Sequence, residues 1–330
     1  MPIHASAPGR TGIVANPADM YGGSVLSCTT RERAVCELFP ADILTLEIAG
    51  ETATIATTSD LAAQSDIFDL LRAVLRGLSI DPAQHAFKLR TATDIPMQAG
   101  LAGSTALVAA VYGAVLAYLG ITQSRHDTAE AIRRIELTEM GVLCGFQDAS
   151  MTVFGGLNFM ELRHKGTHIP ADAQPFATIE PLASDVPTDL PLLLANTGVK
   201  HHSGAAHTPV RERWLAGERG VIDGYERLAM LAHAAKRAIL NADFDTLADA
   251  MNENLRVQQG FGASGAACDH LAAVAMEHGA MAAKLAGAGH GGTVLVLTHE
   301  PQKIAHALTN AGAARVLYPK PSPGLTVEMF

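Results

Sequence analysis

The segment from Ile95 to Ala110, IPMQAGLAGSTALVAA, constrains the fold most, because Gly100, Gly103 and two hydroxyl residues stand directly before a long apolar run. Glycine adopts positive φ angles and lets another molecule approach the backbone closely. Ser and Thr at the mouth of a helix place hydroxyls beside unpaired N–H groups. The segment predicts either an anion site at a helix N-terminus, most often for phosphate, or a turn followed by an ordinary helix cap.

The apolar run, Ala106 to Ile121, is 16 residues long, whereas a membrane-spanning helix needs about 20. It therefore predicts a buried core helix. The N-terminal sequence MPIHASAPGR lacks the apolar stretch of a secretory signal. The 4 cysteines show no C-x-x-C pair or metal-binding spacing, which predicts reduced thiols. We expect a soluble cytoplasmic protein without a membrane partner.

Composition limits the size and the partners. The chain has 330 residues, 48% of them hydrophobic, and at about 150 residues per domain two domains are expected. The net charge of −9 argues against a DNA- or RNA-binding protein, while a local basic pocket for a small anion is compatible with it.

The order of strand and helix patterns predicts an α+β fold, because the two types do not alternate regularly as in a parallel α/β sheet. Five prolines and weak periodicity between Ile169 and Pro191 mark the expected boundary between domains 1–187 and 188–330, with a long surface loop as the alternative. Strands are expected at 43–50, 52–59, 86–93 and 190–198 and, with turns or loops, at 151–162 and 314–330; helices are expected at 66–78, 104–119 and 124–141, with two more between 210 and 283.

A second glycine-rich segment, residues 287–292, has glycine at 4 of its 6 positions. A turn rarely needs so many glycines unless a backbone or a ligand comes close. No G-K-[ST] follows, so it is not a P-loop, and the strand pattern after it excludes a dinucleotide-binding fingerprint, which requires a helix there.

Three segments in order resemble the GHMP kinases, the family of galactokinase, homoserine kinase, mevalonate kinase and phosphomevalonate kinase. They are APGRTGIVANPADMYGG (Ala7–Gly23), similar to the sugar kinases of the family, IPMQAGLAGSTALVAA (Ile95–Ala110) and KLAGAGHGGTVLVL (Lys284–Leu297). The resemblance implies a GHMP kinase fold, with an N-terminal ribosomal-protein-S5-domain-2-like α/β domain, a C-terminal ferredoxin-like domain and ATP between them.

The resemblance also implies how ATP and Mg²⁺ are held. In this family a hydroxyl residue and a glutamate supply the oxygen ligands that Mg²⁺ prefers. The hydroxyl residue here is Ser104 or Thr105, and the glutamate is Glu136. The helix dipole reinforces phosphate binding at the loop. A plain helix cap is the alternative role of Ser104. Nucleotide contacts are expected from Gln98, Ala99, Gly100, Leu101, Ala102, Gly103, Ser104 and Thr105.

Asp148, 12 residues after Glu136, is by resemblance the carboxylate that faces the attacking hydroxyl and accepts its proton. Arg10 is expected to keep Asp148 ionised and to stabilise charge on the transferred group, with a surface ion pair as its alternative. Asp19 is expected to bind substrate hydroxyls, with an Asx turn as its alternative.

Asn16 and Pro17 stand where galactokinase carries a Gly-Glu-His run. The combination of NPADMYGG, IPMQAGLAGSTA and GFQDASMTVFGGL is most similar to the glucuronokinases and also resembles heptose-phosphate kinases. This implies an anionic sugar as acceptor, attacked through the anomeric hydroxyl in the case of glucuronate. Substrate contacts are expected from Asp19, Asn16, Tyr21, Lys200, Ser203, Gly287, Ala288 and Gly289.

Several alternatives stay open at this point. The chain could be a non-catalytic ligand-binding regulator or a decarboxylase of the same fold, and either a monomer or a homodimer. Lys284 could serve the site or be a cation at a helix end. A metal site is a further alternative for His201, His202 and His207, which the sequence brings together without a neighbouring carboxylate.

Overall fold

The computed structural model describes residues 1–163, 165, 176–182, 184, 186, 189–199, 203–287 and 292–330, with the backbone alone for 203–208. Its larger sheet has the order β12-β1-β2-β5-β3-β4, with β6 paired to β2 and β7 to β6. Only the β3–β5 pair is parallel among the described strands of this sheet. The strands are β1 Ile3–Val14, β2 Val25–Pro40, β3 Leu44–Ile48, β4 Glu51–Ile55, β5 Phe87–Thr93, β6 Leu157–Glu161, β7 Thr178–Pro181 and β12 Thr326–Met329.

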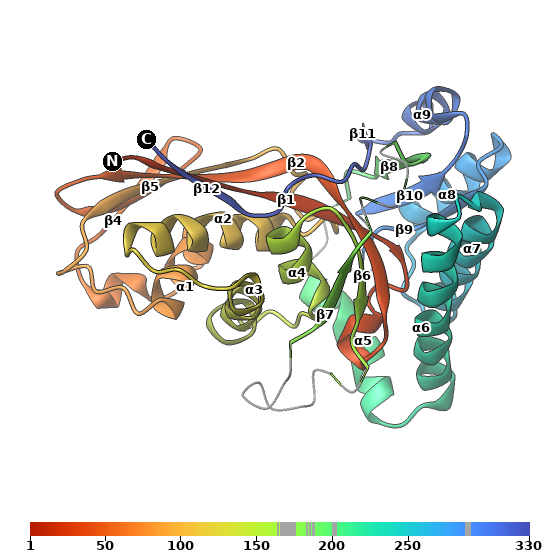
Figure 1. The fold of residues 1–330 in the computed structure, drawn as a ribbon, viewed down its shortest axis with the longest axis horizontal. Coiled ribbons are helices and arrows are strands. Elements are labelled where there is room, and N and C mark those ends of the chain that lie inside the picture. Colours follow the sequence, from red (N-terminus) through yellow and green to blue (C-terminus); the bar gives the residue numbers. More distant parts are fainter. Residues whose placement is uncertain are drawn as a thin grey trace.

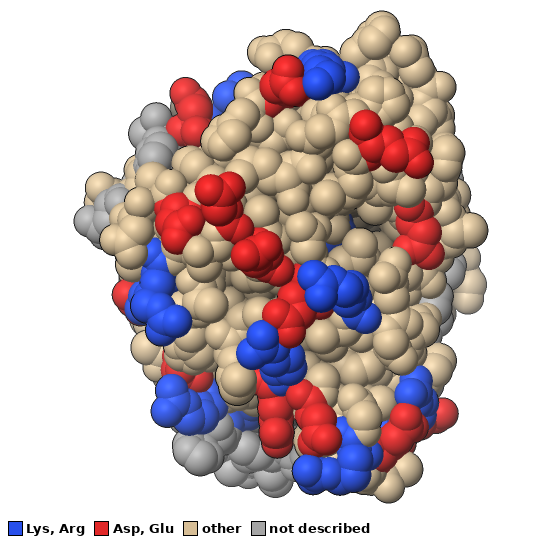
Figure 2. All heavy atoms as spheres, turned by 90° about the vertical axis from the view of Figure 1, so that its right-hand side faces the viewer, with Lys and Arg blue, Asp and Glu red and all other residues tan. Residues whose placement is uncertain are grey.

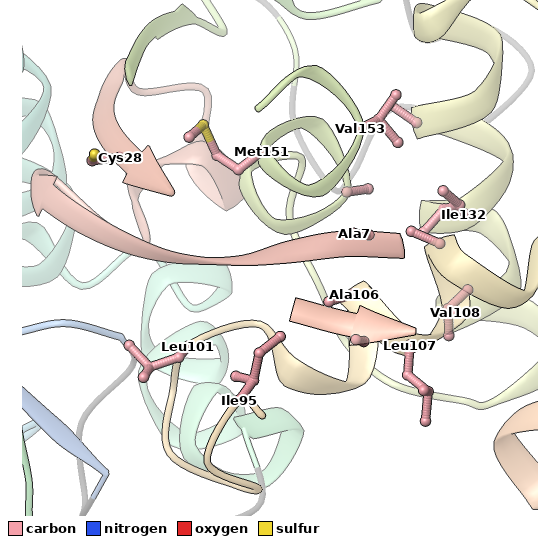
Figure 3. Close-up of a cluster of buried hydrophobic side chains, with 14 of the residues drawn as sticks. Ala7, Cys28, Ile95, Leu101, Ala106, Leu107, Val108, Ile132, Met151 and Val153 are labelled. Carbon is pink, nitrogen blue, oxygen red and sulfur yellow. The ribbon is translucent and has the colours of Figure 1, made fainter. Parts of the chain in front are cut away.

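Helix α2 (Gly103–Tyr118) is the centre of the core. It packs along β1 and β2 and is flanked by the helices α1 (Asp69–Gly77), α3 (Arg125–Arg134) and α4 (Gln147–Phe154) (Figure 1). A helix that is apolar on every side is stable only when it is buried, and α2 is buried around most of its circumference. Figure 3 shows Ala106, Leu107 and Val108 within this cluster. The expected core helix is confirmed.

The smaller sheet, at the other end of the molecule, has the antiparallel order β11-β8-β10-β9 (Figure 1). Its strands are β8 Leu192–Asn196, β9 Ala282–Leu285, β10 Thr293–Leu297 and β11 Arg315–Leu317. The helices on this side are α5 Ser203–Leu215, α6 Arg219–Leu240, α7 Phe244–Gly260, α8 Ala266–Glu277 and α9 Pro301–Asn310. The mixture of antiparallel sheets and helices is the expected α+β fold.

Three sequence-based expectations were wrong in detail. Residues 151–154, expected in a strand, form the last turn of α4, because a short apolar run fits either structure. The region 210–283 holds four described helices instead of two, and left-handed residues such as Gly217 and Gly262 separate them. Helix α9 had no counterpart among the expected elements.

On the face that Figure 2 shows, acidic and basic side chains are interspersed instead of forming one basic patch. Among the described helices, none combines the length and the apolar character that a membrane span requires.

Candidate active site

The first glycine segment wraps the N-terminus of α2. Gln98, Gly100 and Ala102 have φ angles of 54°, 74° and 57°, and the residues between them do not share this sign. Such alternation turns successive backbone N–H groups toward one point and makes an anion-binding concavity. Left-handed φ at a non-glycine residue costs roughly 1–3 kcal/mol and is typical of functional loops.

The first turn of α2 is open for a ligand. Its N-cap is Ala102, and within the described chain no side chain caps it. Ser104 lies one residue inside the helix and is exposed. The helix-cap alternative for Ser104 is therefore wrong, and the N–H groups of this turn remain available to an anion.

The two glycine segments lie against each other. A Cβ on Gly287 would stand 2.8 Å from the carbonyl oxygen of Gly100, closer than a side chain can be accommodated. Strand β1 joins both segments, because the Arg10 amide donates to the Leu101 oxygen at 3.0 Å and the Gly12 amide donates to the Ala286 oxygen at 3.1 Å. Gly287 is thus required by backbone contact between the segments.

Arg10 connects both segments to α4. Its Nε lies 2.7 Å and its Nη2 2.6 Å from one carboxylate oxygen of Asp148, in the first turn of α4. Its Nη1 donates to the Gly100 oxygen at 2.7 Å and faces the Ala286 oxygen at 3.5 Å. The Arg10 side chain is 8% exposed and that of Asp148 28%, so the surface-pair alternative for Arg10 is wrong.

Glu136 is buried in the turn that continues α3, and Thr105 Oγ1 donates to its Oε1 at 2.7 Å. Burial raises the pKa of Glu136 to about 7, and the nearby charge of Asp148 acts in the same direction. A buried carboxylate and two hydroxyls at the start of α2 are hard oxygen donors beside a phosphate-binding loop. This donor set fits Mg²⁺.

Asp19 lies in the short helix η1 (Ala18–Tyr21) and is buried. Its Oδ2 accepts the backbone N–H of Gln147 at 3.0 Å, next to Asp148 in the chain. Burial raises the pKa of Asp19 to about 6, although the Gln147 N–H opposes the shift. Asp19 makes this long-range contact and does not serve as a simple Asx turn.

Asn16 and Lys284 form hydrogen bonds that connect the end of β1 to the second glycine segment. The Nζ of Lys284, in strand β9, donates to Asn16 Oδ1 at 2.7 Å and to the Gly12 oxygen at 3.0 Å. Asn16 Nδ2 donates to the Gly287 oxygen at 2.9 Å. Lys284 is fully buried and burial lowers its pKa well below the usual range. It lies in a strand, so the helix-end alternative is wrong.

The remaining predicted residues divide into described and undescribed ones. The ring of Tyr21 stacks on Tyr225 at 3.9 Å between centroids and lies 5.4 Å from Trp214. Outside the described residues lie Lys200, His201, His202, Ala288 and Gly289, together with the side chains of Ser203 and His207. Within the described part of the chain, no three or more His, Cys, Asp or Glu side chains come together in a group that could hold a metal ion.

Sequence reasoning missed two amides of α7. Asn254 Oδ1 accepts the Ala15 N–H at 2.6 Å, and Gln258 Nε2 donates to the Asn16 oxygen at 3.0 Å. The two side chains are joined to each other at 2.9 Å. Their only signal in the sequence is a pair of amides four residues apart on the buried face of a helix.

Comparison with known proteins decides the family. The family model described as "GHMP kinases N terminal domain" matches residues 65–156, and the model described as "GHMP kinases C terminal" matches residues 235–314. The chain belongs to the GHMP kinase family. The fold and the order of the three sequence segments agree with this assignment.

Relatives of this GHMP kinase include sugar kinases. Glucuronokinase 1 of Arabidopsis thaliana is 27% identical over 321 residues, which cover 88% of this chain and 83% of the relative. D-glycero-alpha-D-manno-heptose 7-phosphate kinase of Campylobacter jejuni is 26% identical over 220 residues, 66% of this chain and 63% of the relative. The structure of Lactococcus lactis galactokinase complexed with galactose has a TM-score of 0.78 at 16% identity, covering 98% and 95% of the chains; it shares the fold.

The pKa of Glu136 leads to a prediction for stability. Folding raises this pKa from 4.5 to about 7. The buried side chain therefore favours the protonated form, and its contribution to stability is complete below pH 4.5 and is lost as the pH rises through 7. The change amounts to roughly 3 kcal/mol. We expect the Tm of the ligand-free protein to fall between pH 5 and pH 8, by less in Glu136→Gln.

Thermal unfolding followed by circular dichroism at several pH values tests this expectation. Glu51→Gln, which removes an exposed carboxylate, is the control and should keep the wild-type pH dependence. An unchanged slope in Glu136→Gln would contradict the raised pKa.

Proposed function

We propose that this kinase transfers the γ-phosphoryl group of ATP to a hydroxyl of an anionic sugar, the anomeric hydroxyl of glucuronate or a related uronic acid. The main support is the Arg10–Asp148 pair, because the buried Arg10 also bonds to the loop at Gly100, and Gln147, next to Asp148, donates to Asp19. A phosphate-binding loop, a carboxylate and a fixed cation thus meet at one place. Phosphoryl transfer needs this positioning and charge neutralisation more than covalent catalysis.

Residues 98–105 are the proposed nucleotide contacts. The N–H groups of the concave loop and of the first turn of α2 would bind the phosphates of ATP. Glu136 and the hydroxyls of Ser104 and Thr105 would hold Mg²⁺, which supplies positive charge against the phosphate oxygens.

Asp148 is the proposed base. It accepts the proton of the acceptor hydroxyl while the hydroxyl oxygen forms a bond to the γ-phosphorus and the bond to the ADP oxygen breaks. Arg10 directs two nitrogens at Asp148, while Nη1 fixes the loop at Gly100. The pair therefore sets the position of the base relative to the phosphates.

The proposed acceptor contacts centre on Asp19 and Tyr21, which share η1. We assign Asn16 to holding the loops, because its side chain is already bonded to Lys284 and to the Gly287 oxygen. Lys200, Ser203, Gly287, Ala288 and Gly289 stay predictions as substrate contacts. The division at 187/188 also stays a prediction, although β12 returns from the C-terminal end to pair with β1.

The similarity to a glucuronokinase supports a uronic acid, and the similarity to a heptose 7-phosphate kinase supports a sugar phosphate as the second candidate. ADP release measured across free sugars, uronic acids and sugar phosphates tests the proposal. We expect glucuronate to give the largest kcat/KM. A preference for a neutral hexose or a non-sugar alcohol would overturn the anionic acceptor, and nucleotide binding without turnover would indicate a regulator.

A further inference from the structure

Helix α5 carries Arg211 near η1, the short helix that holds the proposed acceptor contacts Asp19 and Tyr21. It lies beside η1 (Figure 1), and the two are joined by the rings of Trp214 and Tyr21. Arg211 stands three residues before Trp214, so both side chains leave the same face of α5. The charge of Arg211 acts on the phenol of Tyr21, where it opposes the rise in pKa that burial causes.

Among the described residues, Arg211 has no carboxylate partner. It is half-buried, and within the described chain its enclosed Nε has no hydrogen-bond partner and its guanidinium no carboxylate within 4.0 Å. Arg213 on the same helix is different, since it pairs with both carboxylate oxygens of Glu218 and donates to the Phe261 oxygen.

An unpaired and partly desolvated guanidinium is costly for the protein alone. The cost is recovered when an anion arrives, because the planar guanidinium donates two parallel hydrogen bonds to a carboxylate or a phosphate. The described acids of the site have other partners: Asp148 binds Arg10, and Asp19 accepts from Gln147. The guanidinium of Arg211 is therefore available to pair with an anionic group of the substrate.

We propose that Arg211 binds the anionic group of the acceptor, a carboxylate or a phosphate, and so selects charged over neutral sugars. This inference rests on the proposed function. Tyr21 stands two residues from Asp19, whose partner Gln147 precedes Asp148. An acceptor held at Asp148 by one end therefore extends along η1 toward Arg211 with the other.

The test uses the only tryptophan of the chain, Trp214, whose fluorescence reports binding without turnover. Wild type, Arg211→Gln and Arg211→Lys are titrated with glucuronate, glucose and glucose 6-phosphate, and KM is measured for the best acceptor and for ATP. We expect Arg211→Gln to weaken binding of the anionic acceptor roughly 10- to 100-fold, with little change for glucose or in the KM for ATP. Arg211→Lys should lose less, because it keeps the charge.

Arg219→Gln is the matched control, since Arg219 is 79% exposed at the start of the neighbouring helix and pairs with Asp223 on the same helix. Equal weakening of charged and neutral sugars in Arg211→Gln would show a structural role and overturn the inference. Unchanged binding of the anion by Arg211→Gln would overturn it too, with the proposed function intact. If the wild type itself prefers glucose, both proposals fail. Comparing the titrations with glucuronate and with glucose 6-phosphate identifies whether the site binds a carboxylate or a phosphate.

Discussion

Asp148→Asn is expected to lower kcat roughly 100- to 10,000-fold, the usual contribution of a positioned general base. The amide has the size of the carboxylate and can still accept a hydrogen bond from Arg10, so the packing around the first turn of α4 is kept. It cannot take the proton of the acceptor hydroxyl. Because the Asp148 carboxylate bonds to Arg10 and, within the described residues, not to the N–H groups of the glycine loop, nucleotide affinity should change little.

The measurement is ADP release under saturating acceptor, together with calorimetric titration of a nucleotide. Asp245→Asn is the matched control: Asp245 also lies in the first turn of a helix, α7, but is exposed. It should keep wild-type values of both quantities. Turnover close to that of the wild type in Asp148→Asn would mean that another group accepts the proton, and the proposed mechanism would be wrong.

The local features of the site could be predicted from the sequence because they depend on neighbouring residues. Gly100, Gly103 and the apolar run after them specify a loop followed by a buried helix, and the structure has α2 there. The loop conformation at Gln98 and Ala102 was not predictable in the same way, since neither residue type favours a positive φ.

The long-range features could not be predicted from single segments. Two contacts depend on how the two sheets are brought together. They are the close approach of Gly287 to Gly100 and the hydrogen bond from Lys284 to Asn16. Only the family resemblance related these segments. The amides of α7 and Arg211, whose Nε has no hydrogen-bond partner among the described residues, have no motif, because their roles follow from what the fold places beside them.

Arg10→Lys is expected to be as harmful as any single change in the site. The guanidinium reaches Asp148 with two nitrogens and Gly100 with a third. A lysine ammonium is one point on a flexible stem and cannot hold both partners in a fixed plane. Removing a partner from a buried ion pair costs about 3–5 kcal/mol, and since Asp148 is partly exposed we expect the lower end, about 3 kcal/mol, which is a fall in kcat/KM of roughly 100- to 200-fold.

This variant should differ from Asp148→Asn in one respect. Because Arg10 also fixes the loop at Gly100, Arg10→Lys should weaken nucleotide binding as well as lower kcat. Arg72→Lys is the control, since Arg72 is an equally buried arginine that pairs with Asp66 and Asp69 in another region of the chain. It should lower Tm and leave kcat unchanged at temperatures well below melting.

A double-mutant cycle decides whether Arg10 acts through Asp148. If the arginine acts by positioning the base, Arg10→Lys causes little further loss of kcat once Asp148 is asparagine, and the combined loss is much smaller than the product of the two single losses. The effect on nucleotide binding should persist, because it belongs to the contact with Gly100. Losses in kcat that multiply would mean that the two residues act independently. The short contacts between them would then be structural, and the cation that serves the transferred phosphoryl group would have to be sought elsewhere in the site.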